Sequence, residues 1–147
     1  MASKFELLLQ LAQDRLEAAA DRMRRAQLAL DGAHARLAQL QAYIDDYQQQ
    51  MVAAGSRGMG MERWLDFRVF MDKLTDAREQ QQREVERATQ RLMLERQGWM
   101  NERKKLKAFE TLCARERAAE RQRQQRREQK ALDEFSSRQF QARRNES

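Results

Sequence analysis

The chain has 147 residues, of which 41% are hydrophobic and 35% are charged, and it contains no proline. This composition is too polar for a thick globular core, yet it is not that of a disordered chain. Lys and Arg outnumber Asp and Glu by 29 to 23, and the resulting net charge of +6 favours acidic partners without identifying one.

The single cysteine, Cys113, excludes an internal disulfide, and the single histidine, His34, leaves no His/Cys cluster for zinc. We therefore expect no metal site. The first residues hold no continuous apolar stretch, and the chain contains no run of about 18 apolar residues, so neither a signal peptide nor a membrane span is predicted. These features predict a cytoplasmic protein.

The first predicted helix spans residues 4–53 approximately. Ser3 can cap it, because the Ser3 hydroxyl can accept a hydrogen bond from the Glu6 amide while the Glu6 carboxylate reaches back to the Ser3 amide. Apolar residues then recur at alternating spacings of three and four, which predicts a coiled-coil seam of about six heptads. The seam residues are Phe5, Leu9, Ala12, Leu16, Ala19, Met23, Ala26, Leu30, Ala33, Leu37, Leu40, Ile44, Tyr47 and Met51.

Three of the five glycines lie close together, at Gly55, Gly58 and Gly60. Glycine is unfavourable in a helix because it loses the most backbone entropy on folding. Long stretches on both sides of this cluster are almost free of helix breakers, so the cluster predicts a turn at residues 54–61.

The second predicted helix, residues 62–138, continues the seam but is interrupted by four polar residues. If the chain folds back so that paired residue numbers sum to about 114, three of the four lie opposite alanines. A long stem can then cross the seam while its polar head reaches water. The pairs are Gln81 with Ala33, Glu95 with Ala19, and Glu102 with Ala12, whereas Arg78 faces Leu37. This matching favours an intramolecular antiparallel hairpin over a parallel dimer.

In this register Cys113 lies beside the first residues of the first helix, so the second helix has no partner beyond Cys113. We therefore predict an all-α fold, a long antiparallel two-helix coiled-coil hairpin with a C-terminal single-helix overhang, which forms one elongated domain over residues 1–147. Isolated helices are marginal in water, so we expect the tail at 139–147 to be frayed unless it is bound. The hairpin is expected to be monomeric.

No catalytic chemistry is predicted. The sequence has no GxxxxGK[ST] loop to hold phosphates and no Ser/His/Asp constellation, since His34 lies about a turn from the seam of a long helix. We therefore expect a protein that is not an enzyme and that binds no cofactor.

Residues 115–130 are strongly basic, with seven Arg or Lys against three Glu. Two interpretations remain open: a solvated helix face with ion pairs one turn apart, or a docking segment for an acidic protein surface, with an on-rate that falls as salt rises. Nucleic-acid binding is disfavoured. Basic zipper proteins carry the basic helix before the zipper, and here no aromatic residues interleave the charges.

Near the turn, Tyr43 and Phe70 lie one step outside the seam at the same level. They either widen the core or form a partner surface, because a two-helix hairpin has only one buried stripe and aromatic residues beside it stay partly exposed. The residues alone leave both interpretations open.

A family resemblance rests on the length, the Gly-rich turn and several motifs. The motifs are Leu40-x-x-Tyr43-x-x-x-Tyr47 before the turn, Glu62-Arg63-Trp64-Leu65-Asp66-Phe67-x-x-Phe70 after it, Lys104-Lys105-Leu106, Phe109-x-x-Leu112 and Leu132-Asp133-Glu134-Phe135. Over nearly its whole length the chain resembles FliJ, the small cytoplasmic component of the flagellar type III export apparatus. The aromatic pattern around the turn is the most specific part of the likeness.

The resemblance implies a stalk. FliJ-like proteins look like the central shaft of rotary ATPases: the end with both termini enters the hexameric ring of the export ATPase and promotes its assembly and activity, and another face contacts the cytoplasmic part of the membrane export gate. The family also handles export chaperones. The implied location is cytoplasmic, peripherally associated with the inner-membrane export apparatus.

Two sets of residues in this sequence carry the implied contacts. The implied gate-binding patch is Leu40, Tyr43, Tyr47, Phe70, Leu74 and Ala77. At its edges, Arg36 and Gln81 differ from the Gln and His typical of the family. The candidate contact with the ATPase ring is Arg115, Arg117, Arg121, Arg123, Arg126 and Arg127.

Other functions remain open. One is the equivalent stalk of a virulence type III injectisome, which shares the architecture but not the cargo. Another is a generic coiled-coil scaffold or a parallel homodimer without any link to secretion, which sedimentation would distinguish from a monomeric hairpin. A nucleic-acid-binding helix would require tight, salt-sensitive binding to duplex DNA.

Overall fold

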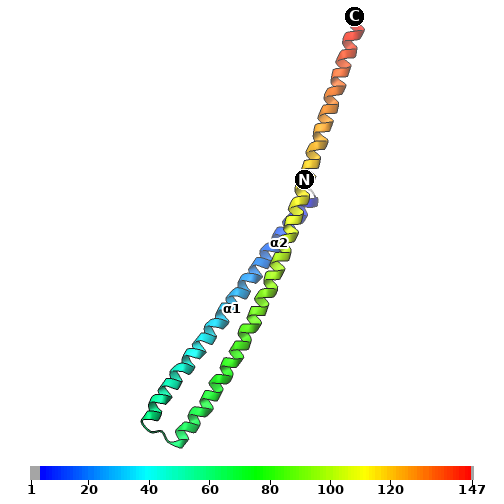
Figure 1. Cartoon of the computed structure of the whole chain (residues 1–147). Helices are drawn as coiled ribbons and strands as arrows, with labels where there is room; N and C mark the ends of the chain where they lie inside the picture. The colour runs from blue at the N-terminus through cyan, green and yellow to red at the C-terminus, as the bar shows by residue number, and fades with distance from the viewer. Residues whose placement is uncertain (1–3, 147) are drawn as a thin grey trace. The chain divides into compact units, whose positions relative to one another are not determined.

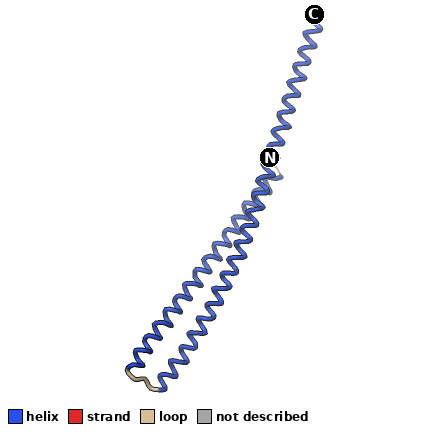
Figure 2. The backbone as a smooth tube through the Cα atoms, in the orientation of Figure 1, coloured by secondary structure: helices blue, strands red, loops and turns tan. Residues whose placement is uncertain are grey.

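The computed structural model describes residues 4–146, and these residues form two long helices. Helix α1 spans Lys4–Ser56 and helix α2 spans Met61–Glu146, with no strand in the described range. Figure 1 shows both helices, and Figure 2 shows the loop that joins them. The predicted all-α hairpin is confirmed. Ser3, the predicted cap of the first helix, lies outside the described residues.

The helix boundaries differ from the expected ones at two places. The loop is short, because α1 continues to Ser56 and only residues 57–60 separate it from α2. Helix α2 continues to Glu146 instead of giving way to a frayed tail after residue 138. No glycine or proline follows Gly98, so no residue in that segment favours an end to the helix.

Gly58 makes the turn possible. Its φ angle is +90°, a conformation that residues with a Cβ rarely adopt, and a residue of this kind commonly ends a helix. The Gly58 amide donates a hydrogen bond to the Gly55 carbonyl at 3.1 Å, and the Trp64 amide donates to the Gly60 carbonyl at 3.1 Å, in the first turn of α2.

The chain divides into two compact units, which we describe separately. Unit 2 comprises Leu16–Asn101 and contains the turn with its two antiparallel helical segments. Unit 1 comprises Met1–Arg15 and Glu102–Ser147, of which residues 4–15 and 102–146 are described.

In unit 2 the predicted seam forms the core. The most buried side chains include three alanines at heptad spacing and three larger residues: Ala19, Ala26, Ala33, Ile44, Leu74 and Leu92. The other seam residues of α1 in this unit are half-buried. The alternating spacing of three and four therefore identified the packed face correctly.

The polar seam residues of unit 2 were expected to reach water with their polar groups, but these groups bond to other parts of the protein. The Gln81 side-chain amide donates to the Ala33 carbonyl at 3.0 Å, which confirms that predicted pair. The Glu95 carboxylate lies 3.4 Å from Arg22 Nε and 3.0 Å from Arg91 Nε, with its side chain only 16% exposed. Arg78, which the sequence left unexplained, donates to the Gln41 side-chain oxygen at 3.3 Å.

In unit 1 the first turns of α1 pack on α2. Ala12 and Cys113 are both 4% exposed, so Cys113 fills the seam as expected. Arg117 reaches across to Glu6 at 3.5 Å. A cavity of about 50 Å³ lies between the helices, and the Glu102 carboxylate lines it with one oxygen buried and without a hydrogen-bond partner.

Beyond this packed region α2 has no partner helix. Every residue from Glu120 to Glu146 is exposed. The predicted single-helix overhang is therefore present, and it is helical throughout the range that the structure describes.

Candidate functional site

Five aromatic side chains form a continuous cluster in unit 2, near the turn. Tyr43 and Tyr47 come from α1, and Trp64, Phe67 and Phe70 come from α2. Residues three and four apart share one helix face, so each helix presents its aromatic residues to the other. Ring centroids are 6.4 Å apart for Tyr43–Phe70, 4.8 Å for Tyr47–Phe70, 5.4 Å for Tyr47–Phe67 and 5.5 Å for Trp64–Phe67.

The cluster brings together part of the predicted gate-binding patch. Tyr43, Tyr47 and Phe70 contact one another, and Leu40 and Ala77 line one shallow hollow nearby. Leu74 is only 9% exposed and belongs to the core, whereas Tyr43 is 51% exposed. The patch therefore widens the core at Leu74 and leaves part of the Tyr43 ring in solvent, and its role as a partner surface stays a prediction.

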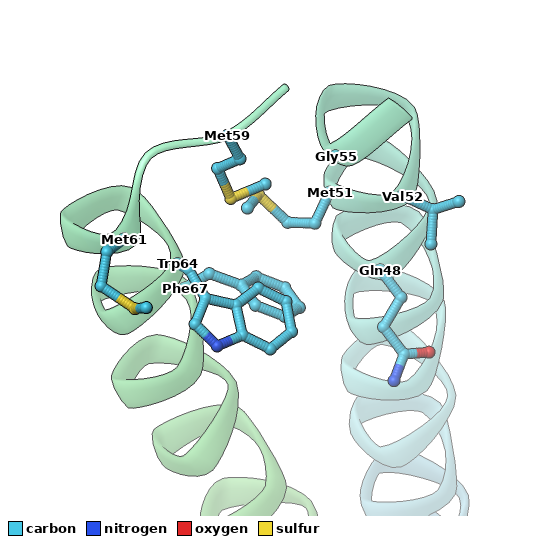
Figure 3. A pocket seen from close by; sticks show the side chains of 8 residues that line it. All are labelled: Gln48, Met51, Val52, Gly55, Met59, Met61, Trp64 and Phe67. Carbon is cyan, nitrogen blue, oxygen red and sulfur yellow. The ribbon is translucent and has the colours of Figure 1, made fainter. Parts of the chain in front are cut away.

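An apolar hollow of about 600 Å³ opens at the turn end of the same cluster. Figure 3 shows Trp64 and Phe67 lying between the two helices, with Met51 and Met59 close above them. The sequence pattern did not predict this hollow. A signal was present, because Met51, Met59 and Met61 flank the Gly-rich turn, and methionine adapts its shape to many partners.

The six candidate ring-contact arginines are all exposed, and they differ in their partners. Arg117 pairs with Glu6, while Arg123 and Arg127 pair with Glu120 at 2.7 and 3.8 Å. Within the described part of the chain, Arg115, Arg121 and Arg126 form no ion pair. Some cations of this segment therefore form internal ion pairs and others do not, and docking to an acidic surface stays a prediction.

The pKa of the Glu120 carboxyl is lowered, first by the hydrogen bonds from the Arg123 side chain and then by its charge. The same pair raises the pKa of Arg123. Both shifts favour the charged forms, and the Glu120–Arg123 pair itself adds no net charge to the segment.

The described residues do not form a cluster of potential metal ligands. Nowhere between residues 4 and 146 do three His, Cys, Asp or Glu side chains lie together in a way that could hold a metal ion. His34 is exposed on α1. Neither described helix is long and apolar enough to cross a membrane.

Residues 1–145 match the family model described as "Flagellar FliJ protein". The chain belongs to the FliJ family. It is 28% identical over 133 residues to the flagellar FliJ protein of Salmonella typhi, with 90% of each chain covered. It is 27% identical over 131 residues to the flagellar FliJ protein of Escherichia coli K12, with 89% of each chain covered.

Membership of the FliJ family confirms the resemblance drawn from the aromatic motifs around the turn. It also favours the flagellar interpretation over the injectisome stalk and the generic scaffold. The roles of individual residues in this FliJ-family chain remain predictions. Substitution of the exposed Tyr43, or of the arginines that form no ion pair in the described chain, can test them.

Proposed function

We propose that this FliJ-family chain is a non-catalytic component of the flagellar type III export apparatus, in which it acts as the central stalk of the export ATPase. The observation that carries the proposal is the family match over residues 1–145. The overhang supports it, because a polar helix exposed from Glu120 to Glu146 gains stability when a partner surrounds it.

The proposed ring contact is the basic segment of α2. Arg115, Arg121 and Arg126 carry charge that no ion pair in the described chain compensates, so an acidic surface gains attraction without breaking existing pairs. A stalk that binds the assembled ring in preference to free ATPase subunits shifts the equilibrium toward the assembled, active ring.

The proposed gate contact is the aromatic patch around Tyr43 and Phe70. Aromatic side chains that keep part of their surface in solvent are frequent anchors of protein interfaces. Through this contact the protein links the ATPase to the cytoplasmic part of the membrane export gate, which places it at the inner-membrane export apparatus. Export chaperones are a further proposed partner.

ATP turnover by the purified export ATPase, measured with increasing amounts of the full chain, tests the stalk. We expect turnover and hexamer assembly to rise until the chain saturates the ring. The concentration for half-maximal effect should increase with salt, because exposed charges are screened. Unchanged turnover and assembly at saturating protein would contradict the proposal.

A double substitution, Tyr43→Ala with Phe70→Ala, tests the gate contact. We expect the helical content to stay intact and the capture of the gate's cytoplasmic domain to fall. Leu65→Ala with Val69→Ala is the matched control, since these side chains are also exposed, by 53% and 56%. Loss of folding in the first variant would instead place both aromatic residues in the core.

A further inference from the structure

The overhang carries two surfaces of different chemistry. In the paired region the seam of α2 is largely apolar up to Cys113, but its continuation at the same spacing is entirely polar. The continuing positions are Glu116, Glu120, Arg123, Arg127, Lys130, Glu134, Ser137 and Gln141. Three large apolar side chains nevertheless remain in this segment and are exposed: Leu132 by 61%, Phe135 by 59% and Phe140 by 68%.

The two surfaces lie on opposite sides of the helix. At about 100° of rotation per residue, Arg123, Arg126, Arg127 and Lys130 fall within about 100° of the helix circumference. Leu132, Phe135 and Phe140 are centred on the other side, where Arg121 and Arg143 also lie. The apolar residues therefore do not continue the face that packs against α1. Because they are three and five residues apart, they also lack the spacing of a coiled coil with a second helix.

This arrangement restricts the shape of the partner. A flat protein surface or a membrane surface contacts about half of a helix, so it would leave either the four cations between Arg123 and Lys130 or the three apolar residues in water. A concave protein that surrounds the helix can meet both faces at once. The uncompensated charge of Arg126 and Lys130 requires acidic groups on one wall, and the apolar residues require an apolar pocket on the other.

We infer that Leu132, Phe135 and Phe140 form an apolar contact with a concave protein surface whose opposite wall is acidic. The inference rests on the proposed function, in which this surface is the lumen of the export ATPase ring. The apolar contact supplies affinity that salt does not screen, whereas the cationic face supplies the salt-dependent part.

Binding of the full chain, labelled at its amino end, to the export ATPase assembled with a non-hydrolysable ATP analogue tests the contact. We expect Leu132→Ala with Phe135→Ala and Phe140→Ala to weaken binding by at least about tenfold at every salt concentration. Alanine favours helix, so the segment stays helical. Arg126→Gln with Lys130→Gln should reduce the dependence of binding on salt.

The matched control is Leu28→Ala with Met93→Ala and Leu94→Ala, at positions that are 69%, 63% and 70% exposed. We expect it to bind like the wild type. If the wild type itself does not bind the ATPase, the proposed function fails. If the wild type binds and the apolar variant binds equally well, only the inference about the apolar contact is overturned.

Vesicles of 30% phosphatidylglycerol in phosphatidylcholine serve as the second probe. We expect the apolar substitutions to leave the low binding to these vesicles unchanged. Strong binding of the wild type that the apolar variant loses, together with unaltered ATPase binding, would overturn the inference in favour of a lipid contact.

Discussion

Individual alanines determine how the seam packs. Ala12, Ala19, Ala26 and Ala33 are all at most 6% exposed, and they repeat every seventh residue along α1. Small side chains at these positions leave space for long ones from α2. The sequence revealed the pairing of Gln81 with Ala33, but it could not reveal that the Gln81 amide bonds to the Ala33 carbonyl, because that choice depends on side-chain conformation.

Ala19→Leu should destabilise the fold. Ala19 is 1% exposed, so a larger side chain has no free volume and must displace its neighbours. We expect a loss of about 1 to 3 kcal/mol in the free energy of unfolding. Urea unfolding followed by circular dichroism measures this free energy. Ala18 is exposed and provides the control, since Ala18→Leu should change stability by less than about 0.5 kcal/mol. Equal effects of the two substitutions would contradict the packing.

The Glu120 carboxyl should titrate below the ordinary range of a glutamate, because Arg123 lowers its pKa. The ion pair therefore stabilises the helix above that range and is lost as the pH falls through the lowered pKa. NMR titration of the carboxyl carbon gives the midpoint. We expect Arg123→Gln to raise it toward the ordinary value and Arg121→Gln to leave it unchanged; a midpoint insensitive to Arg123 would contradict the assignment.

The two helices differ in how well their ends could be predicted. Glycine composition located the turn, but α1 retains Gly55 within its last turn and stops only where Gly58 adopts a left-handed conformation. Which glycine of a cluster takes that conformation depends on how the two helices meet. Low apolar content led to a predicted end of the helix near residue 138, whereas α2 continues to Glu146 through a segment without Gly or Pro.

Substitutions of two glycines in the turn should have opposite effects. Gly58→Ala forces a Cβ into a left-handed conformation and should lower stability by about 1 to 2 kcal/mol, although no atom lies within 4 Å of the new Cβ. Gly55→Ala lies in α1, where alanine is the better helix former, and should raise stability by up to about 1 kcal/mol. Thermal unfolding distinguishes them, and a shift of the same sign for both would contradict the assigned turn.

For the molecule as a whole, the sequence determined the hairpin and the family but only part of the candidate site. The period of the seam and the aromatic motifs were sufficient for the first two. The division of the aromatic patch was not predictable, because the burial of Leu74 and the exposure of Tyr43 depend on the relative rotation of the two helices. The methionine-lined hollow depends on the course of the loop at residues 57–60.

Truncation after Ala119 should separate stability from function. Every residue from Glu120 to Glu146 is exposed, so their loss removes no core packing. We expect the free energy of unfolding to change by less than about 0.5 kcal/mol, while stimulation of the ATPase is lost. Retained stimulation would show that the ring contact lies elsewhere in the chain.

In solution the chain should be a monomer. The seam of α1 is filled by α2 of the same molecule, so between residues 4 and 146 no long apolar stripe remains for a second copy. Sedimentation equilibrium should give the mass of one chain, 17.5 kDa, at all accessible concentrations. A concentration-dependent doubling of this mass would instead favour the homodimer.

The change in the α2 stripe from apolar to charged residues after Cys113 has a practical consequence for fusion proteins. Extra helical residues placed ahead of Lys4 would face Arg and Glu side chains of α2 and would find no apolar surface to pack against. The polar stripe of α2 therefore sets an upper limit to the length of the paired region, which extra helical residues ahead of Lys4 would not extend. Purification tags or fluorescent labels at the amino end should leave the fold undisturbed.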